Sequence, residues 1–337
     1  MSVTPRPGPV APRPIPDSPR VPAALDDDAF TADEERLYLA GRPSLRGFVY
    51  YVQNHARDSV DRASLVERWQ AARARVTVLE RLEAGAADQP QIANLPPRYE
   101  PLLLEFFRNP LVRRSFNTLP TDIVLVPLDQ LVVYQKHIDL VHVRRLRERY
   151  GRDLDEAAVF RICLPSEPSR APVAWSGTRR GQFVFLSPSN DLRYLGASAL
   201  HPEQLAGPGT RGALVGMVGL AVGFGSNFLN AFHAAGRLIL NNGSHRAYAL
   251  REAGVTHVPC VIQQIAGLEE LGLVASRAVR RQPRLYLEHR RPPMLRDYFD
   301  PQLRTIIPSV RRLRQVTVRF KVEETSIPAP PRSRPAL

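Results

Sequence analysis

Apolar residues recur every three to four positions through residues 48–56 and 64–85, the spacing of an amphipathic helix. In the second stretch one face would be lined by Leu65, Trp69, Val76, Leu79 and Leu82. The acidic run Asp26–Asp28, with three more acids at residues 33–35, fits a helix N-terminus, where the helix dipole favours negative charge. The pattern predicts a helical region over residues 26–118.

Beyond Thr121 the pattern changes to short apolar runs separated by glycine, proline and Asn-Asp turns, which is typical of strands. The predicted strands are IVLVPLDQLVVYQ, AVFRICL, GQFVFLSP, LVGMVGLAV, FLNAFH, RLILNN and HVPCVIQ. FLNAFH and RLILNN, joined by residues 234–236, predict a β-hairpin. A helix is expected over residues 138–150, ended by Gly151. We therefore expect an α/β domain over residues 119–268.

The two ends of the chain differ from this central part. Residues 1–25 are rich in proline and are expected to be disordered, as is a tail over residues 326–337. The sequence has no apolar run of about 18 residues, the length a membrane-spanning helix needs. Leu214–Gly225 is too short and too rich in glycine. With no signal-peptide core at the N-terminus, we expect a cytoplasmic protein that does not bind membranes.

The formal net charge is +13, and 44 of the 46 basic residues are arginine. Residues 277–321 hold 13 basic residues and three acids, a net +10. A basic C-terminal extension over residues 269–325 is compatible with binding to nucleic acid or to an acidic protein. It is equally compatible with a solvated arginine-rich surface, and both interpretations stay open.

Cysteine and histidine are not arranged as metal ligands. Cys163 and Cys260 both lie in apolar runs, which predicts buried, inert thiols. Two cysteines cannot build a disulfide framework or a cysteine-based zinc site. His137 and His142 are five residues apart and would not share one face of a helix. We predict no metal site.

The segment NNGSHRAYALREAG, residues 241–254, is the most informative in the chain. Gly243 can take a positive φ and turn the chain sharply off the preceding strand. Ser244 is a suitable N-cap for the following helix, and Gly254 ends it. Capping alone explains the glycine and the serine.

Capping does not explain His245 and Arg246 in the first turn of that helix. A cation at the positive end of a helix dipole costs a few tenths to about 1 kcal/mol, so its presence there requires compensation. A bound anion supplies it, because free amides, a close backbone approach at glycine and a guanidinium together suit phosphate. The alternative is that Arg246 pairs with a carboxylate of the protein.

With Gly243, Ser244, His245 and Arg246 between a strand and a helix, and AGVTHVPCVI as the closing strand, residues 121–265 resemble the ParB/sulfiredoxin superfamily. VLVPLDQLVVYQKHIDLVHVRRLRERYG is similar to the opening strand and helix of that domain, and residues 165–215 look like an insertion. The resemblance implies an α/β fold with a mixed sheet, preceded here by the helical region.

The resemblance also implies a ligand, namely ATP or another nucleotide with Mg²⁺, or another phosphorylated compound. The implied phosphate-binding or nucleotide-binding residues are Asn242, Gly243, Ser244, His245, Arg246, Gln135, Lys136 and His137. The family contains phosphotransferases, nucleases and nucleotide-gated DNA-binding clamps, and shared ancestry does not choose among them. The sequence after residue 265 does not resemble the helix-turn-helix domain that such clamps carry.

Sulfiredoxins have a nucleophilic cysteine where this chain has Ser244. Because a serine hydroxyl without an adjacent base is a poor nucleophile, sulfinic acid reduction is not expected. No catalytic residue is assigned, and Asp139, Asp191 and Glu252 are unranked candidates for a general base.

Two hypotheses for the function remain. One is a nucleotide- or phosphate-binding protein, with phosphotransferase or nucleotide hydrolase activity as its enzymatic form. The other is a non-catalytic module that binds nucleic acid or a protein partner through its C-terminal arginines.

Overall fold

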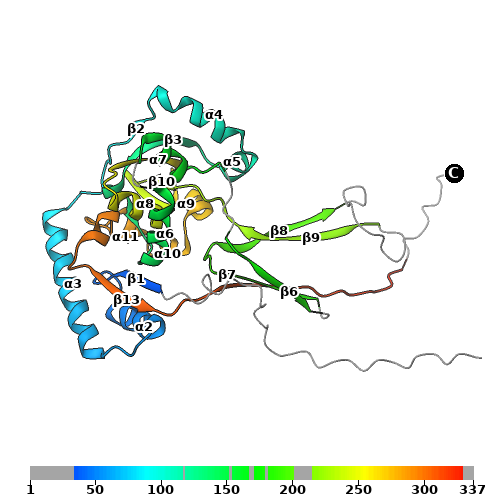
Figure 1. Cartoon of the computed structure of the whole chain (residues 1–337), viewed down its shortest axis with the longest axis horizontal. Coiled ribbons are helices and arrows are strands. Elements are labelled where there is room, and N and C mark those ends of the chain that lie inside the picture. The colour runs from blue at the N-terminus through cyan, green and yellow to red at the C-terminus, as the bar shows by residue number, and fades with distance from the viewer. Residues whose placement is uncertain are drawn as a thin grey trace, which may run out of the picture. The chain divides into compact units, whose positions relative to one another are not determined.

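The computed structural model describes residues 34–116, 118–151, 154–166, 171–178, 181–200 and 215–328 (Figure 1). These residues form two compact units. The large unit comprises the described parts of residues 34–170 and 224–312, and the small unit comprises those of residues 171–223 and 313–328. The predicted tail over residues 1–25 and most of the predicted tail over residues 326–337 lie outside the described residues.

A six-stranded mixed sheet forms the centre of the large unit. In spatial order its strands are β2 (Ala93–Asn94), β3 (Thr121–Pro127), β12 (His257–Gln264), β10 (Asn230–Ala234), β11 (Arg237–Asn242) and β4 (Val132–Val133). β10 pairs in parallel with β12, and β11 with β4, whereas the other neighbours are antiparallel. β12 is buried along nearly its whole length, as expected for a strand covered on both faces. The predicted α/β class is confirmed.

The predicted hairpin of FLNAFH and RLILNN is confirmed as β10 and β11. Ala235 has φ +50° and Gly236 has φ +71°. Two left-handed residues in succession match the twist of the flanking strands and make the tight two-residue connection. The register pairs Ala234 with Arg237 and continues to Asn230 with Asn242. The hairpin therefore delivers residue 242 to the end of the sheet.

A second sheet of three antiparallel strands contains β13 (Arg304–Ser309), β1 (Glu34–Leu39) and β5 (His137–Asp139). The expectation that the acids at residues 33–35 begin a helix is wrong, because Glu34 is the first residue of β1. Glu34 and Arg36 lie two residues apart on one face of the strand, where the guanidinium donates to the carboxylate at 2.8 Å. A charged pair two residues apart shares one face of a strand, whereas a pair on one face of a helix is three or four residues apart.

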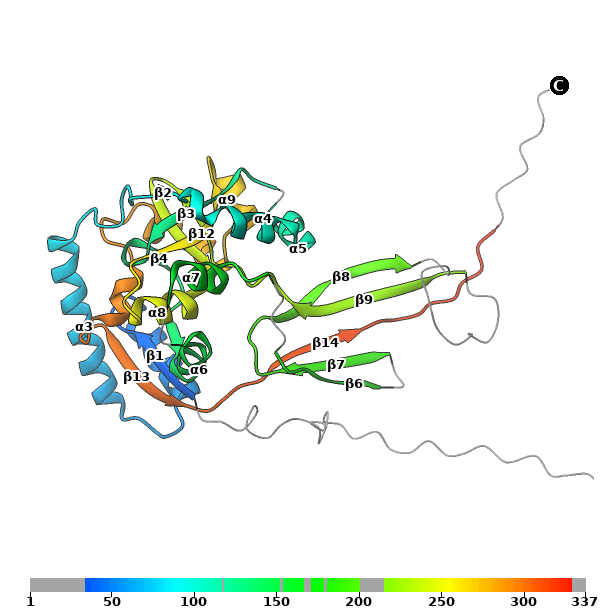
Figure 2. The same ribbon diagram turned by 45° about the horizontal axis from the view of Figure 1, so that its top comes forward.

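Helices surround the two sheets of the large unit (Figure 2). They are α2 (Leu45–His55), α3 (Arg62–Leu82), α4 (Glu100–Arg108), α5 (Pro110–Ser115), α6 (Leu140–Tyr150), α7 (Glu156–Cys163), α8 (Ser244–Glu252), α9 (Leu268–Val274), α10 (Arg277–Arg281) and α11 (Pro283–Leu287). Short 3₁₀ turns are η1 (Pro97–Tyr99), η2 (Leu128–Gln130) and η4 (Leu295–Phe299). α2, α3 and α6 confirm the helices predicted from periodicity. No helix within the described ranges is long and apolar enough to span a membrane.

The buried face of α3 differs from the predicted one at its last position. Leu65, Val76 and Leu79 are buried as expected, together with Ala72, whereas Leu82 is 76% exposed. At 100° per residue, Leu82 is about 100° away from the stripe that Leu65 begins. It is also the final residue of the helix, so it extends past the core.

The run AVFRICL is a helix, α7, and its prediction as a strand is wrong. Asp155 caps it, with the carboxylate accepting from the Ala158 amide at 2.7 Å. Val159, Phe160 and Cys163 are its buried residues, which fits a helical period of i, i+1 and i+4. Cys163 and Cys260 are both buried free thiols, as predicted. Burial raises the pKa of Cys163 to about 12, so it stays protonated.

The small unit consists of strands. β6 (Ala174–Thr178), β7 (Gln182–Ser187) and β14 (Arg314–Arg319) form one antiparallel sheet, and β8 (Leu192–Leu200) and β9 (Met217–Phe224) form a two-stranded sheet. The insertion predicted around residues 165–215 falls largely here. Residues from 313 onward also belong to the small unit, and the predicted boundaries at residues 268 and 325 stay predictions.

A buried arginine ties the segment before η4 to α3. The Arg291 side chain is 1% exposed and pairs with Asp297, which is 3% exposed. Its Nη1 donates to Asp297 Oδ2 at 2.8 Å and to the Pro292 carbonyl at 2.8 Å, while its Nε donates to Glu83 at 2.9 Å. Asp297 also accepts from the Met294 amide at 3.0 Å. Each charge is therefore satisfied several times, as burial requires.

Arg291→Met is expected to lower the free energy of unfolding by about 3–5 kcal/mol, because it leaves the Asp297 carboxylate buried without its partner. Urea denaturation followed by circular dichroism measures this change. Arg284→Met is the control, since Arg284 and Glu288 are 91% and 67% exposed and lie 3.9 Å apart. The control should change stability by less than about 0.5 kcal/mol. Equal losses in the two variants would contradict the role of burial.

Candidate anion-binding site

The turn between β11 and α8 depends on a glycine. Gly243 has φ +100°, in the left-handed region, and is the N-cap residue of α8. A Cβ placed on it would lie 2.9 Å from Leu229 Cδ1 and 3.3 Å from Leu229 Cα. Both the backbone conformation and the close approach of the neighbouring segment therefore require glycine.

The expected cap by Ser244 is wrong. Ser244 is already the first residue of α8, and the N-cap Gly243 makes no side-chain hydrogen bond to the helix. The first turn also contains no acidic residue. The amides at the start of α8 thus have no side-chain cap or carboxylate in sequence, although a helix N-terminus leaves its first four N–H groups without partners in the helix. An anion is one acceptor that suits them.

Arg246 points to the end of another helix. Its Nη1 donates to the carbonyls of Ile162 at 3.0 Å and Cys163 at 3.1 Å, and the residue is 6% exposed. These carbonyls close α7, where the helix dipole is negative, so a guanidinium is favourable there. Neither sequence-based alternative described this contact, because the partners are backbone carbonyls and not a carboxylate. Direct binding of an anion by Arg246 stays a prediction.

His245 is held near two other histidines. Its ring packs edge-on against His142, with ring centroids 5.3 Å apart. Its Nε2 is buried and has no hydrogen-bond partner within the described residues. Burial lowers the pKa of His245 well below its usual value, and the neighbouring His142, His137 and Arg246 lower it further. His245 is therefore neutral at pH 7 and does not oppose the dipole of α8.

The cationic first turn therefore needs no anion to compensate it. His245 is uncharged, and the charge of Arg246 is directed at the C-terminus of α7. The part of the sequence argument that relied on an unfavourable charge at the helix start does not hold. What supports an anion site instead is the uncapped start of α8 and the charge on the neighbouring helix.

That charge lies on α6, whose side chains the sequence analysis did not include. His142 is exposed, and its amide donates to the N-cap Asp139 at 3.0 Å. Desolvation of the ring lowers the pKa of His142, and the positive charges of Arg149, Arg145 and Arg246 lower it further. The negative charge of Asp139 acts in the opposite direction. Arg145 and Arg149 are exposed, and within the described residues neither forms a salt bridge or hydrogen bond. Within the described residues, Arg145 and Arg149 are therefore two unpaired cations whose charge acts on His142.

His142 was set aside because five residues would not place it on one helix face with His137. The two residues indeed share no helix face, since His137 lies in β5 and α6 begins only at Leu140. The strand-to-helix change allows both rings to approach His245. The available signal was Asp139, a residue typical of an N-cap, directly before LVHVRRL.

The other predicted ligands make contacts of their own. The Asn242 side chain donates to the Ser226 carbonyl at 3.0 Å, and the Gln135 side chain donates to the His137 carbonyl at 3.1 Å. Lys136 is exposed, and its carbonyl accepts from the Leu39 amide at 2.8 Å. Of Gln135, Lys136 and His137, it is His137 that acts on His245 electrostatically.

The three candidate general bases lie in different parts of the structure. Asp139 lies beside His142. Glu252 pairs with Arg147 at 3.0 Å at the far end of α8, about 12 Å from its start. Asp191 belongs to the small unit, where it pairs with Arg193. Asp139 is thus the candidate carboxylate nearest to the predicted turn.

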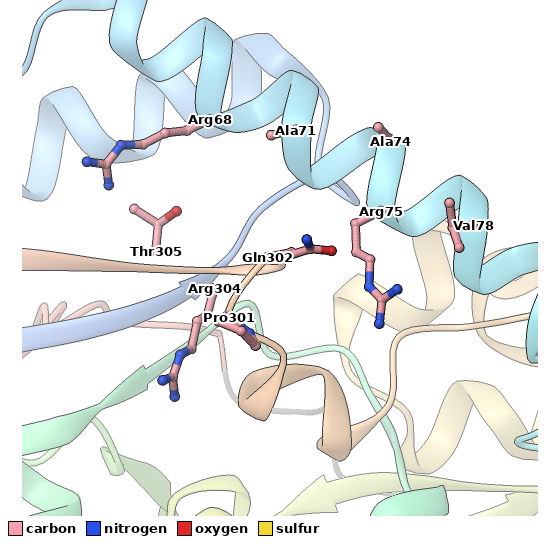
Figure 3. A pocket seen from close by; sticks show the side chains of 9 residues that line it. All are labelled: Arg68, Ala71, Ala74, Arg75, Val78, Pro301, Gln302, Arg304 and Thr305. Carbon is pink, nitrogen blue, oxygen red and sulfur yellow. The ribbon is translucent and has the colours of Figure 1, made fainter.

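Two surface hollows lie elsewhere in the large unit. One, of about 500 Å³, lies between α3 and residues 301–305. Figure 3 shows that Arg68, Ala71, Arg75 and Val78 line it from one side of α3. The second shares Arg75, Pro301 and Gln302 with the first and extends towards η4. None of the predicted site residues lines either hollow.

The basic C-terminal region does not form one free surface. Arg291 and Arg296 pair with Glu83, and Arg311 lies 4.0 Å from Glu34. The region is also divided, since residues up to 312 belong to the large unit and later ones to the small unit. Arg277, Arg280, Arg281 and Arg290 are exposed. Binding of nucleic acid or an acidic protein through residues 277–321 stays a prediction.

Gly243→Ala is expected to lower the free energy of unfolding by about 2–4 kcal/mol, from left-handed strain and the clash with Leu229. Gly254→Ala is the control. Gly254 has φ +89°, but an added Cβ meets nothing within 4 Å, so only the strain of about 1–2 kcal/mol applies. Urea denaturation of both variants measures the difference. Equal losses would show that contact with Leu229 does not matter.

Stability is expected to fall as the pH drops from about 6.5 towards 4. The pKa of His137 is lowered to about 4, first by burial and then by Arg36 and His55. Between these values the unfolded chain binds a proton that the folded chain does not, so acid favours unfolding. We expect a loss of about 1–3 kcal/mol, measured by urea denaturation across this range. His137→Gln should flatten the profile, and an unchanged slope in that variant would contradict the assignment.

No family model matches the chain, and neither does any curated protein or solved structure at the level that would show a relationship. The functional argument therefore depends on the residues of this chain and their geometry.

Proposed function

We propose that the protein binds a phosphate-bearing ligand, of the nucleotide class, at the N-terminus of α8. The observation that carries the proposal is that α8 begins at a left-handed glycine with no side-chain cap and no acid in its first turn. On α6, the exposed Arg145 and Arg149 act electrostatically on His142, whose ring packs against His245 in the first turn of α8, and neither arginine has a salt bridge or hydrogen bond within the described residues. Amides and guanidinium groups that converge on one place favour a group with several negative oxygens.

The resemblance to the ParB/sulfiredoxin superfamily supports the same ligand class. The mixed sheet carries β11, the Gly-Ser-His-Arg turn, α8 and β12 in the order expected from that family. In that family this turn contacts nucleotide phosphates. Ser244 replaces the sulfiredoxin cysteine, so the proposed chemistry is phosphate transfer or hydrolysis and not sulfinic acid reduction.

Each residue has a distinct part in the proposed site. The amides at the start of α8 donate hydrogen bonds to the phosphate oxygens, and Arg145 and Arg149 add positive charge from α6. His142 and His245 are neutral at pH 7, so each imidazole can donate one hydrogen bond and accept a proton. Arg246 fixes α8 against α7 and is a positioning residue. Asp139 orients the start of α6.

Mg²⁺ fits this site only as a companion of the ligand. Within the described ranges no group of three His, Cys, Asp or Glu side chains is placed to hold a metal ion. Mg²⁺ in nucleotide sites is commonly held by one or two carboxylates together with the phosphates themselves. Asp139 is the nearby carboxylate that such an ion would use, and the ion would neutralise charge on the phosphates.

Wild-type protein is expected to bind ATP with Mg²⁺, as measured by isothermal titration calorimetry and by thermal stabilisation. Arg145→Ala/Arg149→Ala should weaken binding about tenfold or more, because two cations near the phosphates are lost. Arg144→Ala/Arg147→Ala is the matched control on the same helix. Those arginines pair with Glu35 at 2.7 Å and with Glu252 at 3.0 Å, and their loss should leave affinity unchanged.

Inorganic pyrophosphate tests whether the phosphates alone are recognised. Absence of heat and of stabilisation with ATP, ADP and pyrophosphate would overturn the proposal. So would equal loss of affinity in the two double variants, because the site would then respond only to net charge. Release of phosphate from ATP, lost together with binding in Arg145→Ala/Arg149→Ala, would extend the proposal from binding to catalysis.

A further inference from the structure

The small unit has far more exposed than buried apolar surface. Its buried hydrophobic residues, within the described ranges, are Ala174, Val184, Leu186 and Leu192. Its exposed large hydrophobic residues are Val173, Trp175, Tyr194, Leu195, Val215, Met217, Val218, Leu220, Phe320, Val322 and Ile327. Exposed hydrophobic residues in this number on so small a unit point to a contact surface, because soluble monomers rarely expose large apolar patches to water.

The β8–β9 hairpin concentrates this surface. Tyr194 and Leu195 are 50% and 52% exposed on β8, and Val218 is 70% exposed on β9. Within the described residues neither strand has a partner on its outer edge. A lone two-stranded sheet is at best marginally stable in water, and three or more strands or a covered face are needed. The hairpin therefore requires something to pair with it or cover it.

The chemistry of the hairpin restricts the partner. Among the residues of β8 and β9, Arg193 is the one charged side chain, and it is paired with Asp191. A strongly acidic or basic partner would find no complementary charge here. Edge strands that do not associate with other chains usually carry proline, lysine or other charged residues. Apart from the paired Arg193, β8 and β9 carry none of these. The partner that suits this edge is an uncharged strand whose backbone N–H and C=O groups are also free to pair. Every copy of this chain carries such a strand.

We propose that a second copy of this chain covers the small unit, with the β8–β9 hairpins of the two copies pairing edge to edge about a twofold axis. Antiparallel pairing of β9 with its mate places Leu220 near the axis and the even-numbered residues of both strands on one face. That face presents Val218, Leu220 and Val222 from each copy. Gly219 and Gly223 alternate with these residues along β9, and a Cβ added to either would lie 3.2 Å from Leu200 or 3.1 Å from Leu195 of β8.

The size of the interface indicates that the hairpin does not act alone. One face of the hairpin covers about 300 Å², since strands of eight or nine residues are about 25–30 Å long and a two-stranded sheet is about 10 Å wide. Edge-to-edge pairing leaves that face open and buries less than this area. A dimer of standard size buries about 800 Å² on each partner. The β6–β7–β14 sheet supplies the remainder, since its register places Trp175, Phe185 and Val316 on one face. Trp175 is 63% exposed there.

Sedimentation velocity at 1–100 µM tests the proposal on the full chain. Wild type is expected to be dimeric, and Val218→Lys should raise the dissociation constant about tenfold, because it removes the apolar cross-strand contact with Val222 of the other copy at two symmetric places. Leu273→Lys is the matched control, since Leu273 is 69% exposed on α9 in the large unit. It should remain dimeric. Circular dichroism should show that both variants are folded.

Disulfide trapping supplies a second measurement that does not depend on a disruptive variant. Both native cysteines are buried, so Leu220→Cys adds one accessible thiol. Mild oxidation should link two copies through position 220, whereas Leu273→Cys should stay monomeric on a non-reducing gel. Monomeric wild type at 100 µM would overturn the proposal, as would a Val218→Lys variant that dimerises like wild type. A monomer that binds lipid vesicles through the hairpin would also overturn it and identify a different occupant.

Discussion

The left-handed conformation of Gly243 is the constraint on which the rest of the large unit depends. It turns the chain from β11 into α8 within a single residue while Leu229 packs at the same place. Because the turn is so short, the start of α8 stays at the end of the sheet. Arg246 then lies in the first turn of the helix, where it donates to the last carbonyls of α7. One glycine thereby sets the relation between a strand and two helices.

The arginine content has a structural explanation that net charge alone does not reveal. Arg36, Arg237, Arg246 and Arg291 are each less than 9% exposed, and each donates to more than one group or to a charged partner. A planar guanidinium with five donors can satisfy several acceptors at once, which a lysine ammonium does less well in a buried site. Some of the arginines that contribute to the +13 net charge are therefore buried inside the fold. The charge available for binding is smaller than the composition indicates.

Sequence reasoning predicted the elements whose signal is local and missed those decided by partners. The β10–β11 hairpin and α6 were predictable because turn residues and caps lie within the segment itself. β1 was mistaken for a helix because its pairing strands, β5 and β13, lie about 100 and 270 residues away in sequence. In α7 a run of β-branched and aromatic residues masked the cap at Asp155. Tertiary context overrides propensity in both places.

The candidate site likewise has some features that the sequence predicts and others that only the fold reveals. Gly243 and its turn follow from the sequence, since few residues other than glycine adopt that conformation. The direction of Arg246 does not follow, because the acceptor carbonyls belong to a helix 80 residues earlier that was itself predicted as a strand. The grouping of His137, His142 and His245 does not follow from the sequence either, because the three lie in β5, α6 and α8. Side chains that converge from separate elements require the fold before they can be recognised as a group.

Neutral histidines at the start of α8 link ligand binding to protons under the proposed function. Burial and nearby cations hold the pKa of His245 well below its usual value. A phosphate bound at the same helix end would favour the protonated imidazole by direct attraction and would raise that pKa. Proton uptake on binding then requires that affinity increase as the pH falls. Two lysines in these positions would bind phosphate more strongly at every pH, but they would oppose the helix dipole whenever the site is empty. Histidine avoids that penalty in the free protein and still provides positive charge when the ligand arrives.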